Sequence, residues 1–446
     1  MKFWIKTYGC QMNVRDAESV GALLQRHGLT SCASEDEADV VIVNTCSVRE
    51  KAEDKAVGKL RLLSAPRRRR RGVLVGAMGC MVQRLGAAIF DAVPGLDFAV
   101  GTQRLARIPA IVDLVAAGRG PVLEAGDGEA DAEALAGHAD GGASAFVNIL
   151  FGCDRRCAYC VVPAVRGAEW SRPAARVLAE VRGLAAHGVK EVTLLGQSVM
   201  AYGQKNAVWP ADYASPCGFA EPLPRLLEAV SAVEGIRRVR FTSGHPSGCT
   251  AELARAMAEL PPVCEHLHLP VQSGSDRVLK RMRRGYTTDG YRRAAERLRA
   301  ARPGFAITTD VIVGFPGETL EDFEATRGFM QEIAFDNAFI FKYSPRPNTP
   351  AFRWDDDVPA DEKARRNRVL LEDQDRTCLR INRGYVGRVE EVLVEGPSLR
   401  NEAAWAGRTR TNKIVIFAPV EGVQAGDLTP VRLERARPQT LYGSVA

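Results

Sequence analysis

The chain has 446 residues, with 60 Lys and Arg against 54 Asp and Glu, a formal net charge of +6 and 46% hydrophobic residues. This composition excludes a largely disordered or fibrous chain, and the length predicts about two to four domains. No run approaches the roughly 20 apolar residues of a membrane span, and the first residues lack the apolar stretch of a secretory signal. We therefore expect a cytoplasmic protein, in which the eleven cysteines are better explained as metal ligands or reactive thiols than as disulfides.

The first 120 residues alternate short β-rich runs with helical stretches, which is the pattern of a parallel, Rossmann-like α/β domain. Strands are predicted at residues 3–8, 39–43 and 72–76, and helices at residues 14–27, 48–64 and 82–92. Residues 123–144 contain six acidic residues, no Lys or Arg and no sustained apolar period. This composition is typical of a linker, which we place at residues 121–144.

The same alternation of strands and helices continues over residues 145–375. Strands are predicted to begin near Phe146, Glu191, Arg237, Glu265, Ala306 and Ala338. Six βα units fit a partial (β/α)6 barrel, in which functional residues lie on loops at the carboxyl ends of the strands. Residues 376–446 change to short strands punctuated by glycine, predicted at 386–389, 392–395, 413–417 and 429–433. This last pattern indicates a small all-β barrel.

The strongest local signal is a C-x3-C-x2-C triplet, Cys153, Cys157 and Cys160, on one short loop after the first strand of the predicted barrel. Three such thiolates can hold three irons of a 4Fe–4S cluster and leave the fourth iron open for chemistry. The alternative is a zinc site completed by a distant fourth ligand, although no histidine is adjacent. The triplet, with Tyr159 before its third cysteine, resembles the radical S-adenosylmethionine (SAM) superfamily, in which the open iron binds SAM and one electron cleaves it to a 5′-deoxyadenosyl radical.

A second triplet is dispersed along the N-terminal domain. Cys10, Cys46 and Cys80 each lie shortly after the carboxyl end of a predicted strand. The carboxyl ends of parallel strands emerge on one edge of a sheet, where open α/β folds bind ligands, so these thiols are expected to converge. A second open iron–sulfur cluster is one interpretation, and three buried structural cysteines are the other. The other cysteines show no metal-binding spacing and are expected to be small buried hydrophobes; they are Cys32, Cys217, Cys249, Cys264 and Cys378.

A three-cysteine α/β domain, a radical SAM domain and a C-terminal β-barrel in this order resemble the methylthiotransferases, whose barrel is the RNA-binding TRAM domain. The resemblance covers essentially the whole chain. The motifs TYGCQMN at residues 7–13, NTCSVR at 44–49 and CVVP at 160–163, followed by Arg166-Gly167, are similar to the branch that acts on dimethylallyladenosine in tRNA. The ribosomal-protein branch typically opens with SLGCPKN, and the threonylcarbamoyladenosine branch with GCKVN.

The resemblance implies an enzyme with two 4Fe–4S clusters. Cys153, Cys157 and Cys160 would hold the SAM cluster, and Cys10, Cys46 and Cys80 an auxiliary cluster whose open iron carries sulfur. The implied reaction is methylthiolation of carbon 2 of N6-dimethylallyladenosine at tRNA position 37. One SAM methylates the sulfur and a second starts the radical step. A radical is the expected route because this aromatic carbon offers little for polar acid–base catalysis.

The resemblance also implies partners for the reaction. They are the tRNA anticodon stem-loop bearing dimethylallyladenosine, an electron donor such as flavodoxin or ferredoxin, and iron–sulfur assembly proteins. We expect a monomer without membrane contact.

Candidates for SAM binding fall at the predicted strand ends, which face the mouth of the barrel. The resemblance places Tyr159 beside the adenine of SAM. Loops that contain Gln197, Ser243, Gln272 and Asp310 could contact its ribose, carboxylate and sulfonium, although an ordinary turn or cap explains each of them as well. Three residues depart from the family pattern: Ser198 stands for an asparagine, Gly244 for a proline and Phe151 for an acidic residue. None of the three is a predicted cluster ligand.

Contacts with tRNA are expected from residues 408–413, where Arg408 and Arg410 precede the strand predicted to begin at Lys413. Arg67 to Arg71 could steer tRNA, but a solvated loop is the more common role of such a run. The rival hypothesis within the class is a methylthiotransferase for threonylcarbamoyladenosine or a ribosomal protein. The rival from another class is a non-catalytic RNA-binding iron–sulfur sensor, which would not form 5′-deoxyadenosine from SAM.

Overall fold

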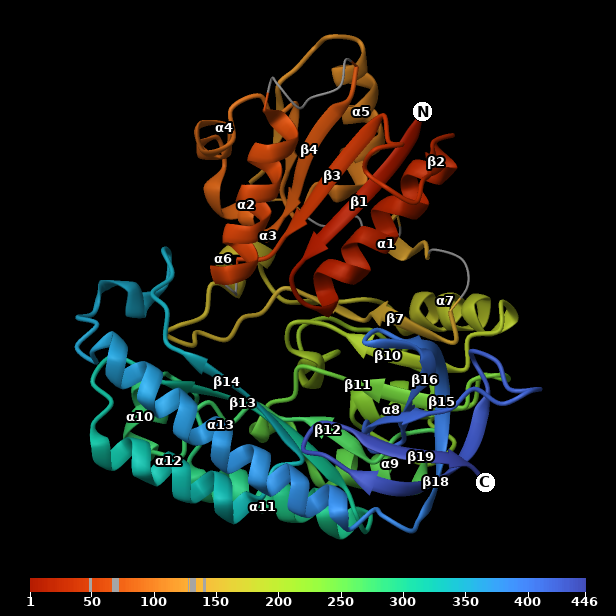
Figure 1. The fold of residues 1–446 in the computed structure, drawn as a ribbon, viewed down its shortest axis with the longest axis vertical. Helices are drawn as coiled ribbons and strands as arrows, with labels where there is room; N and C mark the ends of the chain where they lie inside the picture. The colour runs from red at the N-terminus through yellow and green to blue at the C-terminus, as the bar shows by residue number, and fades with distance from the viewer. Residues whose placement is uncertain (48–49, 66–71, 127, 129–133, 139–141) are drawn as a thin grey trace. The chain divides into compact units, whose positions relative to one another are not determined.

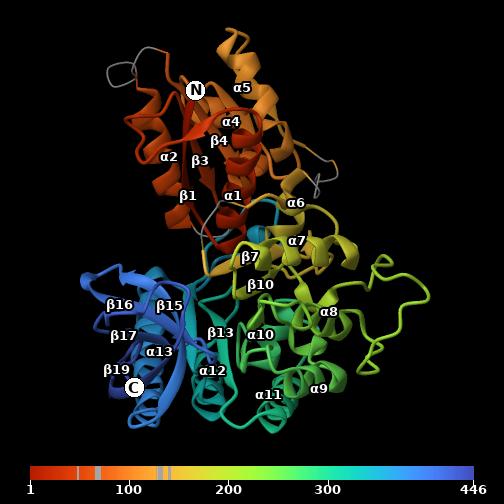
Figure 2. The same cartoon turned by 90° about the vertical axis from the view of Figure 1, so that its right-hand side faces the viewer.

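The computed structural model describes residues 1–47, 50–65, 72–126, 128, 134–138 and 142–446. The chain divides into two compact units, which Figures 1 and 2 show in two views. Unit 1 contains residues 1–140, 151–155 and 160–172, and unit 2 contains residues 141–150, 156–159 and 173–446. The arginine run Arg67 to Arg71 lies outside the described residues. In the part of the chain that is described, no helix combines the length and apolarity needed to cross a bilayer.

Unit 1 is built on a parallel sheet whose described strands have the order β2-β1-β3-β4-β5-β6. The strands are β1 (Lys2–Tyr8), β2 (Thr30–Ser31), β3 (Val40–Thr45), β4 (Leu74–Gly79), β5 (Phe98–Val100) and β6 (Val122–Glu124). The helices are α1 (Gln11–Arg26), α2 (Glu50–Ser64), α3 (Cys80–Leu85), α4 (Ala88–Ala92), α5 (Ile108–Ala116) and α6 (Val162–Arg166), with short 3-10 turns η1 (Leu105–Arg107) and η2 (Ala134–Ala136). The parallel α/β domain predicted from the sequence is confirmed.

Apolar residues bury both faces of this sheet. Val40 and Ile42 of β3 pack in one core with Val20 of α1, and Val43 of the same strand packs in the opposite core with Leu60 of α2. Because both faces of β3 are buried, successive residues must be apolar, which explains the VVIV sequence at its start. The helices therefore clamp the sheet and hold the carboxyl ends of its strands at one edge.

Three details of unit 1 differ from the sequence prediction. The strands β3 and β4 run two to three residues further than expected, to Thr45 and Gly79. The predicted helix over 82–92 is two helices, because Gly86 between α3 and α4 has a φ of 55°. The expected linker is partly folded: it contains β6, and Leu135 is 5% exposed in the core of unit 1.

Unit 2 contains two three-stranded parallel sheets with the orders β11-β10-β7 and β12-β13-β14, linked by a bridge between Val239 and Val263. The strands are β7 (Ser144–Asn148), β10 (Glu191–Leu195), β11 (Arg238–Phe241), β12 (His266–His268), β13 (Ala306–Val313) and β14 (Asn337–Lys342). The helices are α7 (Ala174–Ala186), α8 (Pro222–Ser231), α9 (Ala251–Glu259), α10 (Asp276–Arg281), α11 (Thr288–Ala301), α12 (Leu320–Ile333) and α13 (Ala360–Arg383). The predicted strand starts are correct to within two residues, and the partial (β/α)6 barrel is confirmed.

The C-terminal part of unit 2 is a closed barrel with the strand order β15-β16-β17-β19-β18. The strands are β15 (Val389–Ser398), β16 (Asn401–Thr409), β17 (Ile414–Phe417), β18 (Leu428–Ala436) and β19 (Leu441–Val445). The strand predicted at 386–389 is wrong except for its last residue, because α13 extends to Arg383 and a turn follows. The predicted domain boundary after residue 375 falls inside α13. The remaining short strands are β8 (Leu150–Phe151) and β9 (Trp170–Ser171).

Candidate functional site

Cys10, Cys46 and Cys80 lie at the carboxyl edge of the sheet in unit 1. Cys46 and Cys80 directly follow β3 and β4, and Cys10 follows β1 after one glycine. The strands end level with one another, because Tyr8 pairs with Thr45 and Thr45 pairs with Gly79. The chain reverses its direction of winding between β1 and β3, and this switch point is where open α/β sheets bind ligands. The structure thus brings the three thiols to the edge that the sequence indicated.

Two asparagines hold this edge together. The Asn13 amide donates to Asn44 Oδ1 at 3.2 Å, and the Asn44 amide donates to the Asn13 carbonyl at 2.7 Å. Asn13 Oδ1 accepts from the backbone N–H of Cys10 at 3.2 Å, and its amide also donates to the Thr45 carbonyl at 3.2 Å. Both asparagines are fully buried, so this network fixes the start of α1 against the end of β3. Both residues lie within the motifs at 7–13 and 44–49, but the sequence alone does not indicate this role.

The glycine before Cys80 allows the close approach of β3 and β4. Gly79 has a φ of 103°, and a Cβ there would lie 2.6 Å from Asn44 Oδ1 and 2.7 Å from the Thr45 carbonyl oxygen. Gly28 is a matched control in the same unit, because its φ is 92° and nothing lies within 4 Å of the position of its Cβ. Both alanine variants carry the backbone strain of positive φ, and only Gly79→Ala also overpacks the site.

We expect Gly79→Ala to destabilise the protein by about 2–5 kcal/mol, against about 1–2 kcal/mol for Gly28→Ala. Thermal unfolding followed by circular dichroism measures the difference. The iron content of the two variants after reconstitution should fall for Gly79→Ala and stay at the wild-type level for Gly28→Ala. Equal behaviour of the two variants would show that the packing around Gly79 does not matter.

The surroundings of Cys10 and Cys80 shift the pKa values of their thiols in opposite directions. The pKa of Cys10 is lowered to about 6, mainly by a hydrogen bond with Cys46 and against the effect of burial. Arg166 and the backbone at Asn13 and Met12 lower this pKa further. Burial raises the pKa of Cys80, although Arg166 acts in the opposite direction. The thiol of Cys10 is therefore ionised more readily than the thiol of Cys80.

The donor set fits a cluster better than a single ion. No three His, Cys, Asp or Glu side chains within the described ranges are grouped closely enough for one metal ion. A single zinc ion needs its ligands about 2.3 Å away, whereas each iron of a cluster binds its own thiolate, so the sulfurs lie further apart. Three thiols at the edge of one sheet suit a cluster with one open iron.

The loop with Cys153, Cys157 and Cys160 is held by specific contacts in each unit. In unit 1 the backbone N–H of Cys153 donates to the Gly167 carbonyl at 3.2 Å, and Gly152 before it has a φ of 71°. In unit 2 Nη1 of Arg284 donates to Cys157 Sγ at 3.3 Å. The first contact fixes the backbone at Cys153, and the second fixes the direction of the Cys157 thiol.

Arg284 is a functional candidate that the sequence analysis missed. Burial opposes its charge, but Tyr159, Tyr286 and Cys157 outweigh burial and raise its pKa well above the ordinary value. Its Nη2 also donates to the Pro270 carbonyl at 3.1 Å. No spacing rule links Arg284 to the cysteine loop, so only the fold could reveal this contact.

Three of the residues predicted to bind SAM, Gln197, Ser243 and Gln272, follow strands of unit 2, whereas the expected strand-end position of Asp310 is wrong. Gln197 follows β10, Ser243 follows β11, and Asp310 lies within β13. Ser243 and Gln272 have φ values of 56° and 71°, which are unusual for residues other than glycine and are often found at functional sites. The backbone of Gln272 is held against β13, since its N–H donates to the Asp310 carbonyl at 2.8 Å and its carbonyl accepts from Ile312 at 2.9 Å. Their contacts with SAM remain predictions.

Tyr159 packs on the apolar side of the same region. Its ring meets Phe315 edge to face at a centroid distance of 6.4 Å. The backbone of Ala158 before it donates to the Met282 carbonyl at 2.9 Å and accepts from Ala351 at 2.8 Å. Tyr159 is thus held at a fixed position beside Cys160.

The three departures from the family pattern have local structural roles. The N–H of Gly244 donates to the His268 carbonyl at 3.2 Å, and a Cβ there would lie 2.5 Å from that oxygen, so this position suits glycine and not proline. Ser198 is buried and begins the 3-10 turn η3 (Val199–Ala201). Phe151 stacks on Trp170 at a centroid distance of 6.4 Å.

Arg410 and Lys413, which are predicted to contact tRNA, both have partners inside unit 2. Nε of Arg410 donates to Glu265 Oε2 at 2.8 Å, and its Nη2 donates to the carbonyl oxygens of Pro261 and Val263. Lys413 is buried and pairs with Asp336 at 2.8 Å. The segment 408–413 therefore packs the closed barrel against the partial barrel.

Two buried arginines of β11 complete this packing. Nη1 of Arg238 donates to the Arg408 carbonyl at 2.8 Å, and its Nη2 donates to the Glu391 carbonyl at 2.7 Å. Arg240 donates to the carbonyl oxygens of Arg410 and Thr409, both at 2.8 Å. Three backbone carbonyl oxygens of the segment 408–413 therefore accept hydrogen bonds from the partial barrel.

We expect Arg410→Gln to lower stability by roughly 1–3 kcal/mol and to change tRNA affinity by less than about twofold. The exposed Arg432 of β18 is the control, and Arg432→Gln should leave the melting temperature unchanged. Filter binding at several salt concentrations measures the affinity and its salt slope. If Arg410→Gln reduced the slope of log affinity against log salt concentration by about one and left stability unchanged, Arg410 would be an RNA contact.

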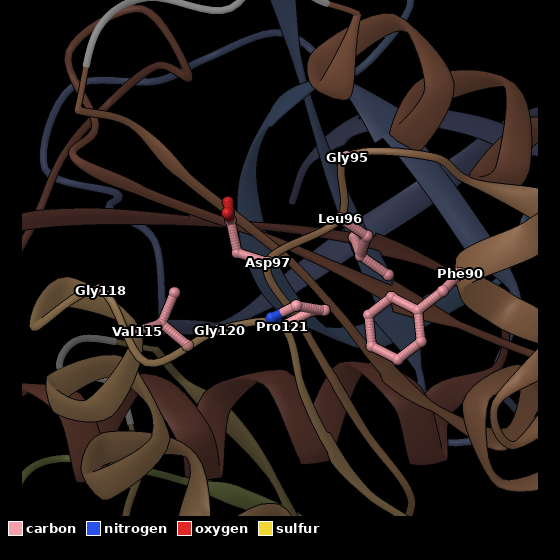
Figure 3. Close-up of a pocket in the computed structure, with 8 residues that line it drawn as sticks. All are labelled: Phe90, Gly95, Leu96, Asp97, Val115, Gly118, Gly120 and Pro121. Carbon is pink, nitrogen blue, oxygen red and sulfur yellow. The ribbon is translucent and has the colours of Figure 1, made fainter.

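A hollow of about 450 Å³ lies in unit 1 (Figure 3). Phe90, Leu96, Val115 and Pro121 supply its apolar lining, and the residues before β5 and β6 form its floor. These residues precede their strands, whereas the cysteines follow theirs, so the hollow is at the opposite edge of the sheet. The Asp97 carboxylate in its wall already accepts from the backbone N–H of Val75 at 2.7 Å.

Three parts of the chain match known families. Residues 2–101 match the family described as uncharacterized protein family UPF0004, residues 147–330 match the radical SAM superfamily, and residues 383–446 match the TRAM domain. Among solved structures, a radical SAM methyltransferase, TsrM from Kitasatospora setae, has a similar fold with a TM-score of 0.54 at 13% identity, covering 79% of this chain and 77% of that chain. The predicted class is confirmed: this is a radical SAM enzyme with a TRAM barrel, a class that works with an iron–sulfur cluster and SAM.

Curated relatives narrow the class to one family. A tRNA-2-methylthio-N(6)-dimethylallyladenosine synthase of Akkermansia muciniphila is 45% identical over 99% of this chain and 98% of that protein. The protein of the same name from Moorella thermoacetica is 44% identical, again over 99% and 98% of the two chains. With this identity along nearly its whole length, the chain belongs to the family of tRNA-2-methylthio-N(6)-dimethylallyladenosine synthases.

Proposed function

We propose that the enzyme methylthiolates carbon 2 of N6-dimethylallyladenosine at position 37 of tRNA and consumes two SAM per product. The observation that carries this proposal is the convergence of Cys10, Cys46 and Cys80 at the switch point of unit 1, in a chain that also contains the C-x3-C-x2-C loop. A single triplet would suffice to generate a radical. A second one is expected where sulfur must also be supplied.

Each triplet would hold one 4Fe–4S cluster. A cluster on Cys153, Cys157 and Cys160 would supply the electron that cleaves SAM, and one on Cys10, Cys46 and Cys80 would supply a site for sulfur. The protein's own residues position these groups: Arg284 directs the Cys157 thiol, and Asn13 and Asn44 fix the backbone beside Cys10 and Cys46. Tyr159, Gln197, Ser243, Gln272 and Asp310 would orient SAM.

The proposal includes the setting in which the enzyme acts. We propose a cytoplasmic monomer that binds the tRNA anticodon stem-loop, receives electrons from a flavodoxin or ferredoxin and obtains its clusters from iron–sulfur assembly proteins. The proposed domains are residues 1–120 for the auxiliary cluster, 121–144 for the linker, 145–375 for the radical SAM core and 376–446 for tRNA binding. Support for the last assignment is the TRAM match at residues 383–446.

The test is an anaerobic reaction of the reconstituted enzyme with SAM, dithionite and tRNA, followed by mass spectrometry of the nucleosides. We expect 2-methylthio product from tRNA that bears dimethylallyladenosine and none from tRNA that bears threonylcarbamoyladenosine. Product from the second tRNA alone would assign the rival substrate. If 5′-deoxyadenosine formed without either product, the radical class would stand and both tRNA substrates would be wrong.

A further inference from the structure

Arg166, which follows the CVVP motif at residues 160–163, is a buried cation beside the thiols of unit 1. It is the last residue of α6, six positions after Cys160, and its side chain is 6% exposed. Its Nη2 donates to Asp16 Oδ2 at 2.7 Å and its Nη1 donates to Asp16 Oδ1 at 3.3 Å. The Asp16 side chain is 3% exposed, so the pair is shielded from water on both sides.

The packing of α6 aims this guanidinium at the cysteine edge. Cys80, at the start of α3, lies in one buried cluster with Val161 and Val165 of the α6 segment. The Thr102 hydroxyl donates to the Val165 carbonyl and fixes the end of α6. Figure 1 shows α6 next to α3 at the end of the sheet toward which β1, β3 and β4 point. The packing of α6 therefore fixes the position of Arg166 in unit 1.

The guanidinium interacts with two of the three thiols as well as with Asp16. Burial works against its charge, but Asp16, Cys80 and Cys10 together raise the pKa of Arg166 well above its ordinary value. Arg166 in turn lowers the pKa of Cys80, against the effect of burial. A full positive charge and a full negative charge thus stand next to each other at the place where the thiolates would carry a cluster.

Charges at such a place control the energy of an added electron. In a buried site a charge acts through a low effective dielectric, so one guanidinium that interacts with the ligands has a large effect. Reduction potentials of iron–sulfur clusters depend on net charge, burial and hydrogen bonds to the sulfurs. A cation favours the more negative, reduced state, and an adjacent carboxylate opposes it.

We propose that Arg166 and Asp16 set the reduction potential of the centre on Cys10, Cys46 and Cys80, with Arg166 raising it and Asp16 limiting the rise. Arg166 is a positioning residue in this account, since it acts through Cys80 and Cys10. The inference rests on the proposed second cluster. The inference adds a control of electron affinity to that proposal. The controlling residue, Arg166, lies shortly after the loop that contains Cys153, Cys157 and Cys160.

The experiment uses the full chain with Cys153, Cys157 and Cys160 replaced by alanine, so that one cluster remains to be observed. The midpoint potential is measured by titration with dithionite, followed by electron paramagnetic resonance. We expect Asp16→Asn to shift the potential upward and Arg166→Gln to shift it downward. Arg166→Lys keeps the charge and should stay closer to the parent value than Arg166→Gln does.

The opposite signs separate this role from a structural one. If the pair only stabilised the fold, both variants would shift the potential in one direction or lower the iron content together, and the inference would be overturned. Arg327→Gln is the control, because it breaks an ion pair with Asp373 in unit 2 and should leave the potential unchanged. If Arg166→Gln fails to hold a cluster, the upward shift in Asp16→Asn still tests the inference.

The outcome also distinguishes this inference from the proposed function. A triple-alanine protein that binds no iron would overturn the second cluster and the inference with it. A protein that binds a cluster whose potential ignores both substitutions would overturn the inference alone.

Discussion

Cys157→Ala is expected to abolish both the cleavage of SAM and the methylthiolation of tRNA. Loss of a group in the second shell of a metal site costs about 10–100-fold, so loss of a direct ligand should lower the rate of 5′-deoxyadenosine formation by more than about a hundredfold. The substitution also leaves Arg284 without the thiol that accepts its Nη1 hydrogen bond. Liquid chromatography of the reaction mixture measures 5′-deoxyadenosine directly.

Cys249→Ala is the matched control for this variant. Cys249 is also buried in unit 2, and burial raises the pKa of its thiol to about 12, so it stays protonated and is a poor ligand. Its replacement by alanine should leave SAM cleavage within about threefold of the wild type, since it removes only one buried sulfur from the core. Normal 5′-deoxyadenosine formation by Cys157→Ala would remove this residue from the SAM cluster.

Cys10→Ala is expected to separate the two activities. The variant should still form 5′-deoxyadenosine, because Cys10 belongs to the other triplet, but 2-methylthio product should fall by more than about a hundredfold. Mass spectrometry of the nucleosides and chromatography of the SAM products from one reaction give both values.

The control for Cys10→Ala is Cys32→Ala, which removes a thiol of the same unit that lies after β2 and donates to the Phe3 carbonyl. It should retain both activities. If Cys10→Ala and Cys157→Ala lost the two activities in the same proportion, the division of labour between the triplets would be contradicted.

The sequence was sufficient to predict the fold and the convergence of Cys10, Cys46 and Cys80 at one edge of the sheet. Both follow from periodicity: apolar runs mark the buried strands, and residues just after parallel strands must share an edge. The prediction that Cys10, Cys46 and Cys80 converge needed only the order of the strands, so errors of two or three residues in the strand ends did no harm.

The partners of the charged residues could not be predicted in this way. Arg166 and Asp16 are 150 positions apart and meet only because α6 packs in unit 1. Arg410 and Lys413 look like an RNA-binding segment in the sequence, yet Glu265 and Asp336 neutralise them inside unit 2. A charge has no periodicity that reveals its partner, so a basic run identifies a surface only after the fold has shown which charges are exposed.

The number of clusters is the most direct test of the account. Iron and acid-labile sulfide would be measured after anaerobic reconstitution in the wild type and in two triple-alanine variants, one for each cysteine triplet. Two open 4Fe–4S clusters predict about eight irons per chain in the wild type and about four in either variant. About four irons in the wild type, with none left after loss of Cys153, Cys157 and Cys160, would contradict the account.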